Sequence, residues 1–213
     1  MVLEKRFDEA ARARVAEAVR MAEAGSRGQV VPVVVARSDV YPEARLRGAL
    51  LGGAVVTAAL LLSPLPFQLT PGELPLAQVA GALLGWGLSL LAPVERFLIG
   101  GQHLDREVKA RAMRAFLEHG LHQTAEGTGV LIFASLLERK AVVLGDHGIH
   151  ARVGDGEWQA TVDALVAGMK RGAPADGFVE AVSRCGARLA EHFPRSGGAV
   201  ANELPDAIEL DRG

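Results

Sequence analysis

The sequence predicts a small mixed α/β domain that is interrupted by a two-helix transmembrane hairpin. The hairpin is indicated by residues 48–94, which contain no Lys, Arg or Asp and only one charged residue, Glu73. The α/β part is indicated by two apolar runs, residues 29–36 and 129–135, which lie between segments of helical apolar spacing. The expected organisation is one α/β domain split into residues 1–47 and 95–194, the hairpin at 48–94, and a polar tail at 195–213.

One helix and one strand precede the hairpin. Apolar residues recur at helical spacing between Phe7 and Ala22, with Glu and Arg between them, so residues 7–24 predict an amphipathic helix. The run QVVPVVVA at residues 29–36 is rich in β-branched side chains and predicts a strand. Pro32 lacks an N–H donor, which favours an edge strand or a bulge.

The hairpin itself divides into two spans, about residues 48–67 and 74–94. A helix needs about 20 mostly apolar residues to cross the hydrocarbon core of a bilayer. Small residues that allow two helices to approach closely recur on both spans, at Gly48, Gly52, Ala59, Gly81, Gly85 and Ser89. Trp86 falls in the middle of the second span and is interpreted as a packing residue. The alternative is a buried helical hairpin of a soluble protein.

The basic residues around the hairpin predict its orientation. Arg37, Arg45 and Arg47 precede the first span and Arg96, Arg106 and Lys109 follow the second, whereas the connecting segment carries no basic residue. The positive-inside rule then places both flanks in the cytoplasm and the connection outside. The expected location is the inner membrane, with two spans.

Two strands and three helices follow the hairpin. Residues 105–121 predict an amphipathic helix, and the segments around Trp158–Met169 and Phe178–Phe193 predict two more. The run GVLIFAS at 129–135 is apolar throughout, as expected of a central strand, and AVVLGD follows after a polar corner, so the pair predicts a β-hairpin.

Composition argues against some classes of function and some structural features. A net charge of -2 gives no electrostatic basis for binding nucleic acid. The single cysteine, Cys185, excludes an intrachain disulfide and lies on the apolar side of its helix. The N-terminus shows no signal-peptide pattern.

The segment GTGVLIFASLLERKAVVLGDHGI, together with the last two helices ending in HFP, resembles the TPM domain family. This family occurs in thylakoid phosphatase-like proteins, a photosystem repair factor, an auxiliary subunit of acetylcholine-gated channels and many bacterial envelope proteins. The resemblance covers residues 7–36 and 105–194 and implies a layered α/β fold. It also implies metal-dependent or weak phosphatase behaviour. Many members carry a signal peptide and a C-terminal membrane anchor, whereas here the hairpin interrupts the domain after its first strand. The chain therefore resembles a membrane-inserted bacterial branch of the family.

The densest polar segment, DHGIHARVGDGEW, follows the last predicted strand. It contains the candidate ligands Asp146, His147, His150, Asp155 and Glu157. Carboxylates with imidazoles could bind a divalent cation, Ca²⁺ or Mg²⁺, and ligands favour the carboxyl ends of strands in α/β sheets. The alternative is a solvated loop in which Asp155 caps the next helix. His119 and His122 are a weaker candidate pair.

No nucleophile motif or phosphate-binding loop is present, because Ser135 lies in no G-x-S-x-G and GTGVL lacks the lysine. The preferred function is a membrane-anchored, non-enzymatic accessory module that binds another membrane protein. The alternative is a metal-dependent phosphatase or hydrolase of weak activity. Self-association of the hairpin through Gly81 and Gly85 is a third hypothesis.

Overall fold

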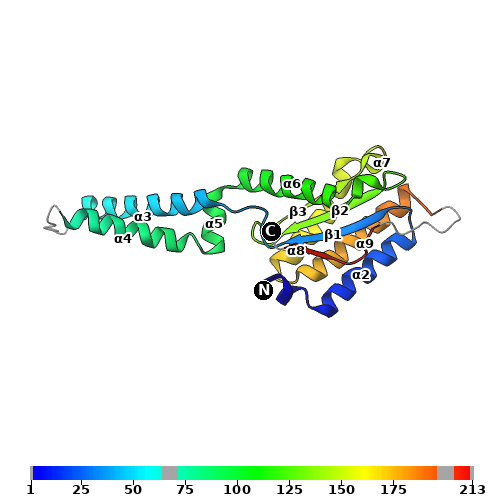
Figure 1. Cartoon of the computed structure of the whole chain (residues 1–213), viewed down its shortest axis with the longest axis horizontal. Helices are drawn as coiled ribbons and strands as arrows, with labels where there is room; N and C mark the ends of the chain where they lie inside the picture. The colour runs from blue at the N-terminus through cyan, green and yellow to red at the C-terminus, as the bar shows by residue number, and fades with distance from the viewer. Residues whose placement is uncertain (1, 64–71, 196–203, 212–213) are drawn as a thin grey trace. The chain divides into compact units, whose positions relative to one another are not determined.

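The computed structural model describes residues 2–63, 72–195 and 204–211, in two compact units (Figure 1). One unit, the α/β domain, takes in residues 1–39 and 106–213. The other, the apolar unit, takes in residues 40–105. The apolar unit is larger than the predicted hairpin because it also contains charged residues on both sides of the apolar segments.

The described part of the α/β domain is built on a four-stranded sheet with the order β3-β2-β1-β4. The strands are β1 (Gln29–Val35), β2 (Gly129–Ser135), β3 (Lys140–Gly145) and β4 (Glu209–Asp211). β1 runs parallel to both β2 and β4, whereas β3 runs antiparallel to β2. The predicted mixed α/β fold is therefore confirmed, and β2 is central, as its continuous apolar run predicts.

Helices cover both faces of this sheet (Figure 1). Alternate residues of a strand point to opposite faces, so the valines of β1 divide between two cores. Val30 and Val34 pack with α2 (Glu9–Ala24), α8 (Gln159–Lys170) and α9 (Pro174–His192). Val31, Val33 and Val35 pack with α6 (Gly101–Glu118). Both cores bury β-branched side chains completely, which is why β1 and β2 carry no polar alternation.

Pro32 corrects one prediction, because β1 is neither an edge strand nor bulged. Pro32 pairs in register with Ile132 of β2, and the ladder continues to Val35. On the other side, β4 pairs only with residues 33–35, so its ladder begins immediately after the proline. The missing N–H thus lies beside the part of β1 that β4 does not cover.

The helix predicted at residues 7–24 is α2, which begins two residues later than expected. Asp8 is its N-cap and accepts a hydrogen bond from Ala11 N at 2.8 Å. A short helix that was not predicted, α1 (Val2–Arg6), precedes it. The other short helices are η1 (Leu121–Gln123), α7 (His147–His150) and η2 (Asp155–Trp158).

The C-terminal segment is more ordered than its polar composition predicts. β4 adds a strand beside β1, Ile208 is buried, and Asp211 forms an ion pair with Arg111 of α6. Backbone pairing and one apolar anchor order this segment, and neither depends on a long apolar run. Residues 196–203 lie outside the described part of the chain.

The apolar unit contains α3 (Pro42–Leu62), α4 (Glu73–Leu88) and α5 (Ala92–Ile99). α3 and α4 pack antiparallel, because Gly48 contacts Gly85 while Gly52 contacts Gly81. The predicted second span, 74–94, is not continuous: α4 ends at Leu88 and the chain turns by 102° into α5. Pro93 explains the break, since it has no N–H to continue the helix and its ring would clash with the preceding turn. The end of the predicted first span, residues 64–67, lies outside the described residues.

Candidate functional site

The predicted polar loop begins at Asp146, which caps α7. Its Oδ1 accepts a hydrogen bond from His147 N at 2.7 Å and lies 3.2 Å from His147 Nδ1. The side chain is about nine-tenths buried, and its Oδ2 has no hydrogen-bond partner among the described residues. Asp146 is therefore fixed in place by a structural cap, with one acceptor left unused.

The position of this loop differs from the prediction. Because β3 is antiparallel to β2, its carboxyl end lies where β1 and β2 begin, and Asp146 N donates to Gly129 O at 2.9 Å. The carboxyl ends of the parallel strands β1 and β2 lie at the opposite end of the sheet, measured along the strands. The rule that places ligands at those carboxyl ends therefore does not apply to this loop.

Apart from His147, whose ring contacts Asp146, the described candidates of the loop do not gather around this carboxylate. The His147 side chain is 83% exposed, His150 is exposed at the end of α7, and Glu157 pairs with Arg188 at 3.3 Å. Asp155 begins η2, and its side chain lies outside the described part of the structure; the N-cap positions are Gly154 for η2 and Trp158 for α8. Within the described residues, no three His, Cys, Asp or Glu side chains come together in a group able to hold a metal ion.

His119 and His122 do not share a helix as predicted. α6 ends at Glu118, and His122 lies in η1, where its Nε2 is 3.3 Å from Gln123 Nε2. Gly120, at φ 69°, separates the two histidines and redirects the chain.

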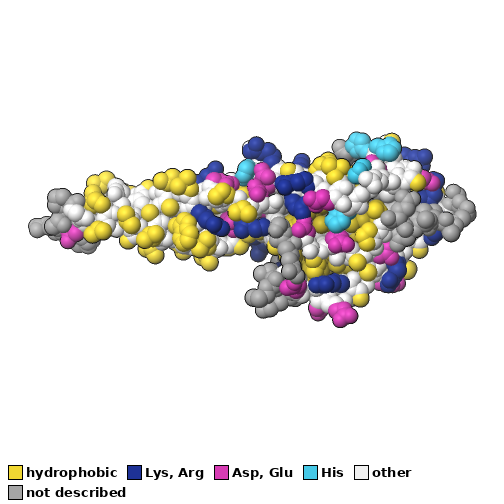
Figure 2. Space-filling view, in the orientation of Figure 1, with side chains coloured by type: hydrophobic (Ala, Val, Ile, Leu, Met, Phe, Trp, Pro, Cys, Tyr) yellow, Lys and Arg dark blue, Asp and Glu magenta, His cyan; other side chains and the backbone are white. Residues whose placement is uncertain are grey.

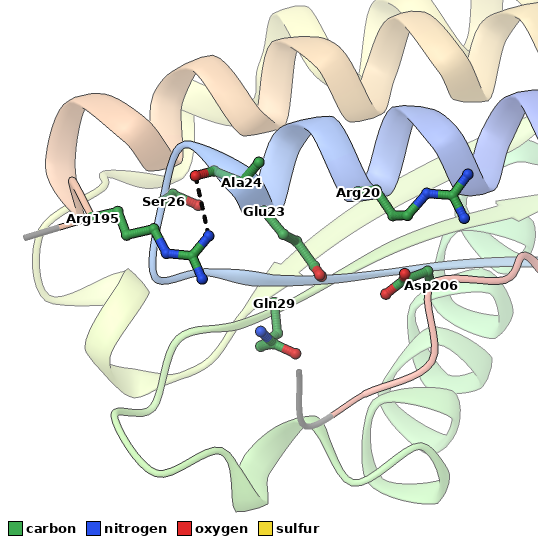
Figure 3. A pocket seen from close by; sticks show the side chains of 7 residues that line it. All are labelled: Arg20, Glu23, Ala24, Ser26, Gln29, Arg195 and Asp206. Carbon is green, nitrogen blue, oxygen red and sulfur yellow. Dashed lines mark hydrogen bonds between the residues drawn. The ribbon is translucent and has the colours of Figure 1, made fainter. Parts of the chain in front are cut away.

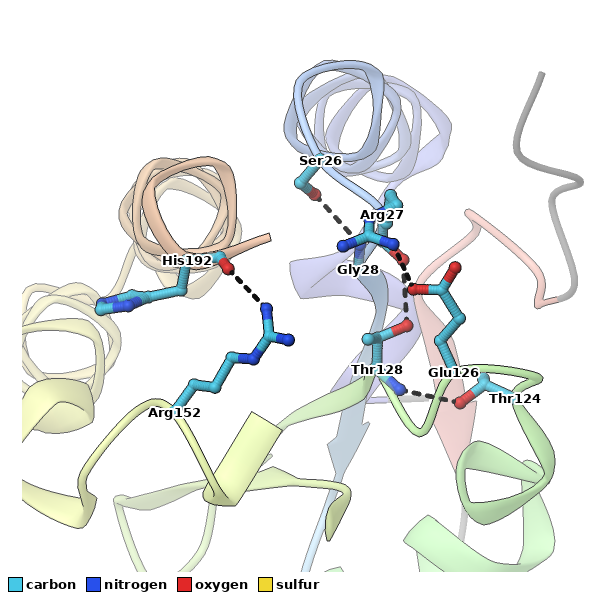
Figure 4. A network of polar contacts seen from close by, with 8 residues as sticks. All are labelled: Ser26, Arg27, Gly28, Thr124, Glu126, Thr128, Arg152 and His192. Atoms are coloured by element: carbon cyan, nitrogen blue, oxygen red, sulfur yellow. Dashed lines mark hydrogen bonds and ion pairs between the residues drawn. The ribbon is translucent and has the colours of Figure 1, made fainter. Parts of the chain in front are cut away.

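A network of polar contacts lies at the same end of the sheet as Asp146, where β1 and β2 begin (Figure 4). Arg27 pairs with Glu126 at 2.9 Å, and Thr128 Oγ1 donates to Arg27 O at 2.9 Å. Nearby, Arg152 donates to His192 O at 3.3 Å and stacks over the Phe193 ring. These contacts join loops that are far apart in sequence, so the network holds this end of the sheet together.

At the opposite end of the sheet, Glu138 joins the carboxyl ends of β1 and β2. Its side chain is buried; Oε1 accepts from Ser38 N at 2.8 Å and Oε2 from Ser135 Oγ. Sequence reasoning treated Glu138 as a polar corner and missed this role. Arg139, at φ 54°, makes the turn that brings Glu138 back over the strand ends.

A pocket of about 190 Å³ lies beside the start of β1 (Figure 3). Glu23 lines it and accepts a hydrogen bond from Val30 N at 2.8 Å. Burial, against the lowering effect of the Val30 hydrogen bond and with a smaller contribution from the nearby Asp206, raises the pKa of Glu23 to about 7. Arg20 and Arg195 also line the pocket, so it mixes both charges. The signal in the sequence was a glutamate next to the buried stripe of α2, which is too weak to identify a pocket.

The surface of the apolar unit is the most distinctive feature. Most large apolar side chains of α3 and α4 are exposed, including Leu50, Val55, Leu62, Leu76, Leu84 and Leu88. On the face drawn in Figure 2, hydrophobic side chains spread over the two helices, and basic side chains gather towards the end of the unit where α3 begins. Of the described helices, α3 alone is long and apolar enough to cross a membrane, and α4 and α5 reach that length only together, across their bend.

Polar groups of this hairpin bond within it. Gln78 Nε2 donates to Thr57 Oγ1 at 2.8 Å, and Thr57 donates to Gly53 O at 3.0 Å. Ser89 Oγ donates to Trp86 O at 2.6 Å. Such internal pairing is what an environment without water requires of polar side chains.

Comparison with known proteins adds a family and a fold. Residues 97–188 match the family model of the TPM domain. The NMR structure of the BA42 protein from the psychrophilic bacterium Bizionia argentinensis is similar, with a TM-score of 0.59 over 95% of this chain and 93% of that chain. Its sequence identity is 19%, so the likeness concerns the fold. No curated protein matches.

Proposed function

Because residues 97–188 of this chain are a TPM domain, we propose that the protein is a membrane-anchored TPM-domain protein that acts as an accessory module for another membrane protein. The hairpin of α3 and α4 inserts into the inner membrane as two spans. The α/β domain stays in the cytoplasm and provides the binding surface.

The observation that carries the anchor is the outward apolar surface of α3. Almost none of the apolar stretch of α3 is buried, whereas a core helix of a water-soluble protein hides its apolar side chains. Contiguous exposed apolar surfaces of this extent are found at contacts with membranes or other proteins. Lipid solvates such a surface on all sides, and the internally paired Thr57 and Gln78 suit the same environment.

The distribution of charge supports the orientation. Arg45 and Arg47 lie in the first two turns of α3 and Arg96 lies after α4, at the same end of the antiparallel hairpin. Glu73 begins α4 at the opposite end. By the positive-inside rule, the arginine end lies in the cytoplasm.

A groove between α2 and α9 supports the accessory role. It encloses about 290 Å³ and is lined by small side chains such as Ala18, Ala187 and Gly186, with Met21 68% exposed at its rim. Small residues allow a partner helix to approach closely, and methionine adapts to varied apolar surfaces. The groove therefore suits an apolar helix of a partner protein.

Two measurements test the proposal. Alkaline extraction of cells should leave the intact chain in the membrane pellet; recovery in the supernatant would refute the anchor. Affinity purification from gently solubilised membranes should recover a membrane protein that is lost with Ala187→Glu, a charge in the groove. Ala160→Glu places the same charge at an exposed position of α8 and should retain the partner. Equal recovery with both variants would refute the groove as the binding surface.

Metal-dependent phosphatase activity is the second candidate, favoured by the unused Oδ2 of Asp146. It requires turnover of a generic phosphate ester that depends on Mg²⁺ or Ca²⁺ and is abolished by Asp146→Ala. Turnover that is absent, or unchanged in the variant, would eliminate it.

A further inference from the structure

The bend after α4 indicates a second contact with the membrane, an inference that rests on the proposed anchor. We propose that α5 lies in the plane of the membrane at the base of the hairpin, as an interfacial helix bound to lipid of the inner leaflet. In Figure 1, α5 runs across the base of the helix pair. The 102° turn between α4 and α5 places α5 close to the membrane plane whenever α4 lies near the membrane normal.

The length of α4 supports this placement. Its 16 residues extend about 24 Å, which is less than the hydrocarbon core of about 30 Å. A helix with its side chains is about 10 Å thick. A transverse α5 that is partly immersed at the base therefore supplies apolar surface over the depth that α4 leaves uncovered.

The two sides of α5 differ as an interfacial helix requires. Glu95 and Ile99 are buried on one side, and α5 packs on α3. Phe97 lies on the opposite side and is 83% exposed, more than any other large apolar side chain in the described structure. Interfacial helices immerse such apolar side chains about 5–10 Å into the boundary between headgroups and acyl chains.

Arg47 holds the bend in place. Its Nη1 donates to Leu98 O at 2.5 Å and to Ile99 O at 3.3 Å, so a cation from α3 caps the carboxyl end of α5. The transverse helix is therefore bonded to the first span. Trp86 falls in the last turn of α4 and is 46% exposed, which corrects its interpretation as a mid-span packing residue. An exposed tryptophan at this level fits the aromatic belt of a membrane interface.

The exposed apolar side of α5 continues the apolar surface of the hairpin, so lipid is the favoured contact of α5. The exposed side of α5 follows directly from Leu90 and Leu91, which are exposed like the leucines of α4. Arg96 lies about 100° around α5 from Phe97, as neighbouring residues of a helix do, and gives this helix a basic flank for headgroups. An apolar side and a basic flank on one short helix match a bilayer surface.

Spin-label depth measurement tests this inference on the full chain. Cys185 is completely buried, so a label introduced at an exposed position is the reactive site. Single variants Phe97→Cys, Arg96→Cys, Val55→Cys and Met113→Cys would be labelled and reconstituted in vesicles of phosphatidylethanolamine and phosphatidylglycerol. Collision rates with oxygen, which enriches in acyl chains, and with a water-soluble nickel chelate then report depth.

The expected label at position 97 is reached by oxygen more than by nickel, about 5–10 Å below the phosphates. The label at position 96 should collide with the nickel chelate more often than the label at position 97, because position 96 lies on the basic flank of α5. Nickel access at 97 equal to that at Met113, an exposed position of α6, would overturn the interfacial helix. Protection of 97 from both reagents would also overturn it, because a second copy of the chain or another protein segment would then cover α5. The Val55 label separates the two proposals: a deep Val55 with an aqueous Phe97 refutes only the interfacial helix, whereas an aqueous Val55 refutes the anchor.

Discussion

The close packing of α3 on α4 depends on glycine, and Gly52→Ala tests that dependence. A Cβ at Gly52 would lie 2.1 Å from Gly81 O, and contacts below 3.0 Å essentially do not occur. The helices would have to separate by roughly 1 Å, which loosens packing along the pair and strains the 2.8 Å bond from Gln78 to Thr57. Overpacking of this kind costs about 1–3 kcal/mol.

Gly53→Ala is the matched control on the same helix. A Cβ there would meet Gln78 O at 3.6 Å, an ordinary contact. Replacing a glycine inside a helix by alanine stabilises it by up to about 1 kcal/mol. The two variants should therefore move in opposite directions.

Unfolding of the full chain in mild detergent by added denaturing detergent, followed by far-UV circular dichroism, measures both effects. Gly52→Ala should unfold at a lower denaturant fraction than wild type, and Gly53→Ala at an equal or higher one. Equal midpoints for the two alanine variants would refute the reasoning that α3 and α4 meet backbone to backbone.

Three further predictions concern the α/β domain. The pKa of Glu23 is raised from 4.5 to about 7 in the folded state, so folding favours the protonated form, and stability should fall as the pH rises from about 4.5 to about 7. Glu23→Gln should remove this slope in denaturant unfolding at several pH values; an unchanged slope would contradict the assignment. Glu138→Ala should lower the free energy of unfolding by about 1–3 kcal/mol, because the buried Ser38 N and Ser135 Oγ lose their acceptor, and a change within error would show that water replaces it. Asp146→Ala should cost about 1 kcal/mol through the lost cap of α7, whereas Asp146→Asn, which keeps an acceptor, should cost less; equal losses would argue against capping.

The sheet core was predictable because burial leaves a direct mark on sequence. GVLIFAS is apolar from Val130 to Ala134 because both faces of β2 are covered, and the valines of β1 follow the same rule. The amphipathic helices α2 and α9 are equally visible because each buries one side. The resemblance to the TPM domain, confirmed over residues 97–188, rests on the hairpin of β2 and β3 and on the last two helices, α8 and α9.

The remaining features depend on relations between distant segments. β4 could not be predicted, because three residues become a strand only when β1 offers a free edge. Asp146 lies at the end of the sheet where β1 and β2 begin because β3 runs antiparallel to β2. The role of Glu138 depends on the approach of Ser38, which is 100 residues away in the sequence. The break before α5 has a local sequence signal, Pro93, but residues 74–94 are apolar almost throughout and therefore predicted one continuous span.

The central claim is that α3 and α4 cross the inner membrane with both flanks inside. Labelling of intact cells by a membrane-impermeant maleimide tests it most directly, using Glu73→Cys at the start of α4 and Met113→Cys on α6. The account predicts that the Glu73 position is labelled in intact cells and that the Met113 position is labelled only after the membrane is disrupted. Labelling of Met113→Cys from outside, or labelling of both positions only after disruption, would contradict it.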